Sequence, residues 1–143
     1  MEARDIVGVY GNDESDPFVD AVQRLVIFVA ATRQLRFQYR YNLESNHGYD
    51  RRFSEGTVTR AGRGALALTR TTHREWGWED WSREERFHAS AAAERHELRF
   101  ADRAFTYCGT RFTWREDVTA QTLSPFEDAR AESERLRRRL RAR

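Results

Sequence analysis

The chain has 143 residues, of which 39% are hydrophobic and 34% are charged, a balance typical of one globular domain with a single core. No apolar run reaches the length of a membrane-spanning helix, and the opening MEARDIVGVYGN lacks a secretory hydrophobic region. We therefore expect a cytoplasmic protein with no membrane partner. The single cysteine, Cys108, excludes an intramolecular disulfide and a multi-cysteine zinc site.

The positive charge is concentrated at the C-terminus. All 25 basic residues are arginine, and the net charge is only +2. Residues 124–143 hold seven of these arginines and four acidic residues, so the body of the chain has no excess of positive charge. Because nucleic-acid-binding domains usually carry a basic surface, we expect no nucleic-acid partner for the body.

The predicted elements alternate strands with short turns. A first strand at 5–11 is followed by Asp16-Pro17, an N-cap and a first-turn proline that predict a short helix over 17–23. A β-branched run at 24–30 predicts the second strand. The six further predicted strands are 35–44, 49–61, 64–78, 83–93, 96–101 and 104–116. The turns between them are short, as antiparallel hairpins require.

The last predicted element is a helix. Ser124–Glu127 has the sequence of a capping box with proline at the first helical position, which predicts a helix to about residue 140. We expect Phe126 and Leu136 of this helix to cover the outer face of the second strand. The chain is thus predicted to form a β-barrel over 1–123 and a charged helix over 124–143, both in one domain.

Counting outward from the turns places one apolar set of residues on a common face. Eight antiparallel strands with one such face predict an all-β, up-and-down barrel wide enough to hold one small ligand. The opposite face, with His73, Glu75 and His88, is expected to contact solvent. The apolar set comprises Phe37, Tyr39, Tyr41, Phe53, Leu66, Leu68, Trp76, Trp78, Phe87, Leu98, Phe100, Phe105, Tyr107 and, beyond a bulge at Gly109, Phe112 and Trp114.

Charged residues interrupt this apolar face. Arg51, Arg70 and Arg74 are predicted to lie on it together with Glu55 and Glu85. One interpretation is a network of salt bridges within the wall. The other is that an arginine without its own acid receives an anionic ligand through its planar donor fork. On the second interpretation the ligand-binding residues are Arg51, Arg70, Arg74, Trp76, Trp78, Phe53, Phe87, Tyr41 and Phe100.

The same face suggests acid–base chemistry if the protein is an enzyme. Glu55 or Glu85, desolvated among aromatic rings, would act as an acid or base. Tyr39 or Tyr107 would donate a proton, and the arginines would stabilise a developing oxyanion. The reaction would be an isomerisation or cyclisation that needs no cofactor.

Metal and nucleophile chemistry receive little support from the sequence. His73 and His88 are predicted to face each other beside Glu75, which could hold a metal ion, but on a solvent face we interpret them as a hydrated pair. We therefore predict no metal and no cofactor. The chain has no phosphate-binding loop, dinucleotide fingerprint or Ser-His-Asp spacing.

The pattern resembles the lipocalin and fatty-acid-binding (calycin) barrels. Gly8-Val9-Tyr10 in the first strand is similar to the lipocalin Gly-x-Trp, with tyrosine in place of tryptophan, and Arg111 or Arg115 supplies an arginine in the last strand. The resemblance implies an eight-stranded calyx for small hydrophobic ligands, often with internal arginines for a carboxylate. A fainter likeness, in GVYGN, DPF and YDRRF, is to the bilin chromophore lyases. The alternative fold is a helix-grip, START-like domain, whose last helix would be more broadly apolar.

Taken together, these patterns predict a barrel that binds a small anionic amphipathic or aromatic molecule, in specialised metabolism. The alternative is an interaction module that uses the arginine-rich C-terminal helix for an acidic partner or nucleic acid. A homodimer is compatible with either hypothesis.

Overall fold

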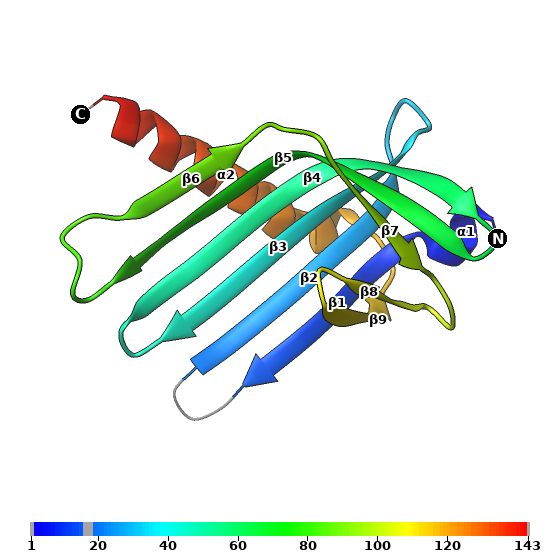
Figure 1. Cartoon of the computed structure of the whole chain (residues 1–143), viewed down its shortest axis with the longest axis horizontal. Coiled ribbons are helices and arrows are strands. Elements are labelled where there is room, and N and C mark those ends of the chain that lie inside the picture. The colour runs from blue at the N-terminus through cyan, green and yellow to red at the C-terminus, as the bar shows by residue number, and fades with distance from the viewer. Residues whose placement is uncertain (1, 16–18, 143) are drawn as a thin grey trace.

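In the computed structural model, which describes residues 2–15 and 19–142, the chain forms an antiparallel sheet of nine strands curled into a half-barrel, with a helix at each end of the chain (Figure 1). The elements are α1 (Ala3–Ile6), β1 (Gly8–Ser15), β2 (Val19–Val29), β3 (Leu35–Ser45), β4 (Gly48–Gly62), β5 (Ala65–Glu79), β6 (Arg86–Ser90), β7 (Glu94–Arg99), β8 (Ala104–Tyr107), β9 (Thr110–Glu116) and α2 (Ala120–Arg141).

Strand β5 is long enough to pair with two different strands along one of its edges. The sheet order is β6-β5-β4-β3-β2-β1-β9-β8, and β7 also pairs with β5. The part of β5 from His73 to Gly77 pairs with β6, and the part from Ala65 to Arg70 pairs with β7. The predicted hairpin between residues 83–93 and 96–101 is therefore wrong, because both segments pair with β5 instead.

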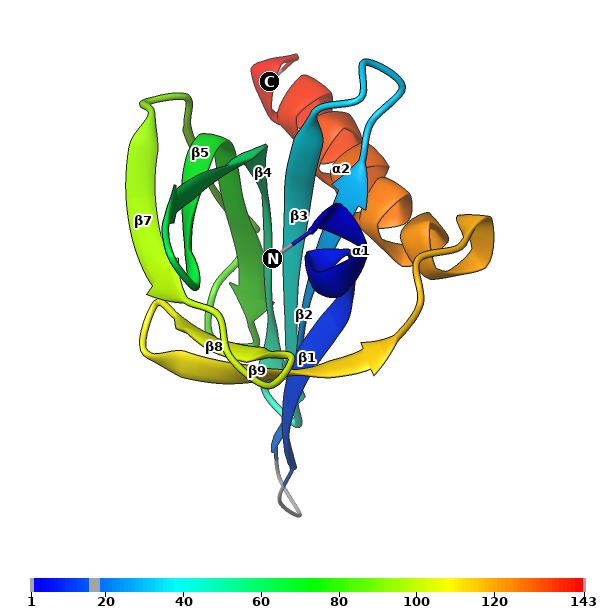
Figure 2. The ribbon, with the colours of Figure 1, turned by 90° about the vertical axis from the view of Figure 1, so that its right-hand side faces the viewer.

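The curl brings β7 and β8 together at one end, where Ala101 and Ala104 form an isolated bridge (Figure 2). In the order of hydrogen-bonded strands, β6 is the edge strand on one side and β8 is the edge strand on the other. The antiparallel, barrel-like class is confirmed, but the sheet is a half-barrel where a closed eight-stranded barrel was predicted.

The helix predicted over 17–23 and the strand predicted over 104–116 differ in the structure. The predicted helix over 17–23 is absent from Val19 onwards, because these residues belong to β2 and pair one by one with β3. Asp16 and Pro17, which carried that prediction, lie outside the described residues. The predicted strand 104–116 is two strands, because Cys108 and Gly109 both have positive φ, 50° and 80°, and form a turn.

Helix α2 starts earlier than predicted. Thr119 is its N-cap: its hydroxyl accepts a hydrogen bond from the Thr122 backbone N–H at 3.1 Å, and its own N–H donates to Thr122 Oγ1 at 2.7 Å. This reciprocal cap satisfies the first free donors of the helix. Pro125 therefore lies inside the helix, where the sequence had suggested a start at Ser124.

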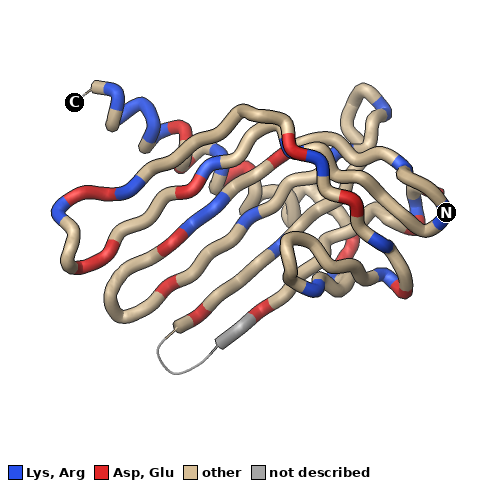
Figure 3. The backbone as a smooth tube through the Cα atoms, viewed as in Figure 1, with Lys and Arg blue, Asp and Glu red and all other residues tan. Residues whose placement is uncertain are grey.

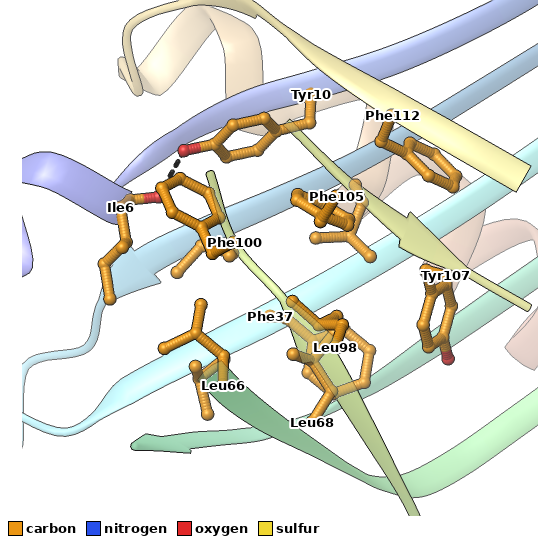
Figure 4. Packing of buried hydrophobic residues seen from close by; sticks show 13 residues of the cluster. Ile6, Tyr10, Phe37, Leu66, Leu68, Leu98, Phe100, Phe105, Tyr107 and Phe112 are labelled. Carbon is orange, nitrogen blue, oxygen red and sulfur yellow. Dashed lines mark hydrogen bonds between the residues drawn. The ribbon is translucent and has the colours of Figure 1, made fainter. Parts of the chain in front are cut away.

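The concave side of the sheet holds an aromatic cluster that we call the inner core (Figure 4). Tyr10 lies fully buried within it, and its hydroxyl donates to the Ile6 carbonyl at 2.7 Å, which fastens α1 over one end. Phe105 stacks on Phe112, with ring centroids 5.5 Å apart. The inner core comprises Ile6, Tyr10, Leu25, Ile27, Phe37, Val58, Leu66, Leu68, Leu98, Phe100, Phe105, Tyr107 and Phe112.

The other side of the sheet is covered by α2 (Figure 2). We call this second cluster the outer core; it comprises Val9, Val26, Phe53, Trp76, Phe126 and Leu136. Phe126 and Leu136 belong to this cluster together with Val26 of β2. The sequence had predicted Leu25, Ile27 and Val29 as the outer residues under the helix, and this is wrong, because Leu25 and Ile27 face the inner core and Val29 is exposed.

A bulge in β5 decides which residues face which core. Glu55 pairs with Thr72 and Gly56 pairs with Arg70, so Thr71 is an extra residue in β5. Because side chains alternate along a strand, one extra residue turns every later side chain to the opposite face. Gly56 fits this position because a Cβ there would lie 1.9 Å from the Thr69 carbonyl oxygen.

Candidate functional site

A cavity of about 240 Å³ opens on the concave side, beside the inner core. The sheet supplies one wall, and the turn between β8 and β9 supplies the other. The lining residues are Gln23, Tyr39, Tyr41, Arg52, Ser54, Arg70, His73, Glu75, Tyr107, Cys108 and Thr110. Four of these are tyrosine or arginine side chains that the sequence placed on the predicted binding face: Tyr39, Tyr41, Arg70 and Tyr107.

Two register shifts place the other predicted charged residues on the face under α2. The bulge at Thr71 turns Arg74, and the shift between Arg60 and Gly62 changes the face expected for Arg51 and Glu55. The predicted common face is therefore wrong for Arg51, Arg74, Glu55 and Glu85, which contact α2. Arg51 contacts Glu132; Arg74 donates to Ser133 Oγ at 2.9 Å. Glu55 accepts both arms of Arg130, at 2.8 and 3.0 Å, and Glu85 accepts from Arg139.

The aromatic residues predicted around these charges divide in the same way. Phe53 and Trp76 are buried in the outer core, and Phe87 packs against it. Trp78 donates from Nε1 to the Ser82 carbonyl at 3.0 Å, in the turn after β5. Phe100 lies in the inner core and does not line the cavity.

A chain of three side chains crosses the cavity wall. Ser54 Oγ lies 2.6 Å from Nδ1 of His73, and Nε2 of His73 lies 2.7 Å from a Glu75 carboxylate oxygen. Ser54 and His73 are directly paired across β4 and β5, and Glu75 follows two residues later on the same face. The side chain of Glu75 is 40% exposed and that of His73 is 11% exposed, whereas Ser54 as a residue is 1% exposed.

The electrostatic surroundings indicate the protonation states of His73 and Glu75. Burial lowers the pKa of His73 and outweighs the opposing Glu75 hydrogen bond. Burial raises the pKa of Glu75, but the His73 hydrogen bond and the Arg52 charge outweigh it and hold that pKa below its usual value. Near neutral pH a neutral imidazole therefore meets a carboxylate, which can only accept. The ring proton sits on Nε2, and Nδ1 accepts from the Ser54 hydroxyl.

Two arginines of the cavity retain an unused donor. Arg52 lies over the Tyr41 ring at 4.7 Å and donates from Nη2 to Asp50 at 3.2 Å. Arg70 donates from Nη2 to Glu94 at 2.5 Å. The Nε atom of each arginine is buried and has no hydrogen-bond partner among the described residues. Nε of Arg52 lies 3.9 Å from a Glu75 carboxylate oxygen, within ion-pair distance but beyond a hydrogen bond. Such a buried donor costs free energy until an acceptor reaches it.

The phenols of the cavity are hydrogen-bond donors at neutral pH. Burial raises the pKa of Tyr39 and of Tyr107 above the ordinary tyrosine value. Tyr39 donates to Gln23 Oε1 at 3.0 Å, and the Tyr107 ring meets the His96 ring edge-on at 5.3 Å. The hydroxyl of Tyr107 points away from the rings of the inner core (Figure 4).

Sequence reasoning missed His73, Ser54 and Arg52. His73 was expected on a solvent face opposite His88, but it pairs with Ser90 and is buried, while His88 pairs with Glu75. The signal that could have found it is Gly56, a small residue in mid-strand, since glycine inside a strand often marks a bulge.

Across the described residues, no three His, Cys, Asp or Glu side chains come together as a metal site would require. Neither helix in this part of the chain combines the length and the apolar character needed to cross a membrane. Comparison of the chain with protein-family models, curated proteins and solved structures finds no match in any of the three.

Proposed function

We propose that the protein binds a small anionic molecule with an aromatic or apolar body in the cavity of the half-barrel. The observation that carries this proposal is the pair of buried Nε donors on Arg52 and Arg70. A carboxylate oxygen would satisfy both the hydrogen-bonding capacity and the charge of a guanidinium. The Tyr39 and Tyr107 rings beside these donors would contact the apolar body.

The size of the cavity limits the ligand. Its volume of about 240 Å³ is below the range of roughly 300–1,000 Å³ that holds drug-sized molecules. A benzoate-sized or phenylpyruvate-sized acid suits this space better than a long fatty acid. This size, together with the polar lining, favours a narrower ligand class than the calycin resemblance implies.

The alternative role for the C-terminal helix has less support. Arg130 and Arg139 of α2 form ion pairs with Glu55 and Glu85 of the sheet. These arginines thereby serve to dock the helix, which leaves fewer of them for an acidic partner or nucleic acid.

Calorimetric titration tests the proposal with matched acids and amides: benzoate, phenylacetate and phenylpyruvate against benzamide and phenylacetamide. We expect at least one acid to bind, and its amide to bind at least tenfold more weakly. Arg52→Gln and Arg70→Gln should each weaken the acid at least tenfold, because each loses a charge-assisted hydrogen bond worth about 1.5–3 kcal/mol.

The control is Arg99→Gln, a change at an exposed position of β7 outside the cavity. It should leave affinity unchanged within about twofold, since Arg99 is not among the lining residues. Equal affinity for acids and amides, or an equal loss in Arg99→Gln, would overturn the proposal.

A further inference from the structure

The Ser54–His73–Glu75 chain gives the cavity a group that can take up a proton. Its two hydrogen bonds, at 2.6 and 2.7 Å, join three side chains in series. A nucleophile or acid–base hydroxyl, a base, and a third group that orients the base form the arrangement found in many catalytic sites. All three residues line the cavity assigned to the anionic ligand.

We propose that this chain is a catalytic proton relay that enolises a bound carbon acid, such as a 2-oxo carboxylate, in the cavity. This inference rests on the proposed function, since the carboxylate of the substrate would be held by Arg52 or Arg70.

The polarity of the chain favours proton uptake. The Glu75 carboxylate accepts from Nε2–H, so the lone pair on Nδ1 is directed toward the Ser54 hydroxyl. When His73 becomes an imidazolium, its new charge lies against the Glu75 carboxylate, which stabilises it. Arg52 and Arg70 act in the opposite direction, because both positive charges disfavour protonated His73. His73 is therefore neutral before the reaction, and the Glu75 carboxylate balances its positive charge after the reaction.

The reaction balances without a cofactor. The C3–H bond of the 2-oxo acid breaks, and its proton passes to Ser54 Oγ while the Ser54 hydroxyl proton moves to Nδ1 of His73. The electron pair of that bond forms the C2–C3 double bond of the enolate, and the carbonyl electrons move to oxygen. One of the two arginines, Arg52 or Arg70, would hold the carboxylate, and the Nε donor of the other would stabilise this oxyanion. Return of the proton to carbon or oxygen gives the keto acid or its enol.

The two ends of the Ser54–His73–Glu75 chain differ in exposure. Only 1% of Ser54 is exposed, so its hydroxyl is shielded from bulk water. Glu75, whose side chain is 40% exposed, links the chain to water at the opposite end.

Deuterium exchange measures the relay directly. With phenylpyruvate in D2O, proton NMR should show the C3 hydrogens exchanging at least tenfold faster with the protein than in buffer. His73→Gln, which keeps hydrogen-bonding capacity but is not basic, should return exchange to the buffer rate. Phenylpyruvate affinity should stay within about threefold. His47→Gln, in the turn before β4 and outside the cavity lining, is the matched control and should keep the full rate.

A second measurement is independent of any ligand. The ¹⁵N shifts of His73 near pH 7 should show a protonated Nε2 and an unprotonated Nδ1. The opposite tautomer, or phenylpyruvate binding without His73-dependent exchange, would overturn the relay alone. Failure of every acid to bind would instead overturn the proposed function, and the relay with it. Labelling of Ser54 by a fluorophosphonate would show that Ser54 is a nucleophile. That result would overturn the relay and favour acyl transfer.

Discussion

At the scale of single residues, the placement of two arginines depends on one inserted residue. Arg70 and Arg74 would share a face in a regular strand, but Thr71 is extra and they lie on opposite faces. Arg70 faces the cavity and pairs with Glu94, whereas Arg74 faces α2 and contacts Ser133 and Glu134. Each guanidinium thus has a polar partner, as a partly buried charge requires.

The bulge itself is testable through Gly56. A Cβ at this position would lie 1.9 Å from the Thr69 carbonyl oxygen. Because this atom belongs to the backbone of a paired strand, it can move only slightly to relieve the clash. Gly56→Ala should lower the free energy of unfolding by about 3 kcal/mol, the upper end of overpacking costs, in urea titrations. Gly11→Ala is the control, because its Cβ would meet the movable guanidinium of Arg24 at 2.7 Å. A smaller loss at Gly56 than at Gly11 would show that the bulge tolerates a side chain.

Burial of His73 predicts a pH dependence of stability. Its pKa in the folded state lies below the ordinary value near 6.5, so the unfolded chain binds more protons as the pH falls below about 6.5. The free energy of unfolding should therefore fall between pH 7.5 and pH 5.5, more in the wild type than in His73→Gln. Urea titrations at four pH values measure the slope.

A change at Glu75 gives a second test of this pH dependence. Its hydrogen bond opposes the effect of burial on His73, so Glu75→Gln should lower the pKa of His73 further. Stability should then fall more steeply in the same pH window. Equal slopes in wild type and His73→Gln would contradict the assignment of a neutral, buried imidazole.

At the scale of elements, α2 is held on the sheet by charge as well as by apolar contact. Acidic and basic residues are both scattered along the strands, and basic residues gather toward the C-terminal end of α2 (Figure 3). Among the described residues, four ion pairs join α2 to β4, β5 and the loop before β6: Glu55 with Arg130, Arg51 with Glu132, Arg74 with Glu134, and Glu85 with Arg139. Tyr49 also donates to Glu85 at 2.7 Å; burial and this bond raise the pKa of Tyr49 to about 12.

The pair of Glu55 and Arg130 should carry the largest measurable coupling. Its contact is bidentate, and the Glu55 side chain is only 18% exposed. A double-mutant cycle with Glu55→Gln and Arg130→Gln should give about 1 kcal/mol, decreasing in high salt. The pair of Arg95 and Glu97, with both side chains more than half exposed, should give close to zero. Equal couplings would show that burial does not strengthen the helix pair.

Much of the element order was predictable from the sequence, because turn residues and apolar alternation mark hairpins. The register between neighbouring strands was not predictable in the same way. A bulge adds one residue without changing composition, and the count missed two register shifts between β4 and β5. The shift at Thr71 turns Trp76 and Arg74, and the shift between Arg60 and Gly62 turns Phe53 relative to the expected face. The pairing of β7 with β5 also escaped prediction, since it depends on β5 being longer than β6. The cavity residues supplied by β3 and β8, such as Tyr39 and Tyr107, lie where no bulge intervenes and were anticipated.

At the scale of the whole molecule, one sheet separates two cores with different tasks. The inner core continues into the cavity wall through Tyr107, which belongs to both. The outer core fixes α2 and shares no residue with the cavity lining. The cavity proposed for the ligand and the docked helix are therefore physically separate, on opposite faces of the sheet.

Two leucines with the same exposed fraction test this separation. Leu136 of α2 and Leu98 of β7 are each 5% exposed, one in each core. Either change to alanine should lower the free energy of unfolding by about 2–3 kcal/mol, near the lower end for buried leucine. Leu136→Ala should leave acid affinity unchanged within about twofold, whereas Leu98→Ala should weaken it, because Tyr107 loses packing in its own cluster. If Leu136→Ala weakened binding as much, α2 would form part of the ligand site and the two cores would act as one.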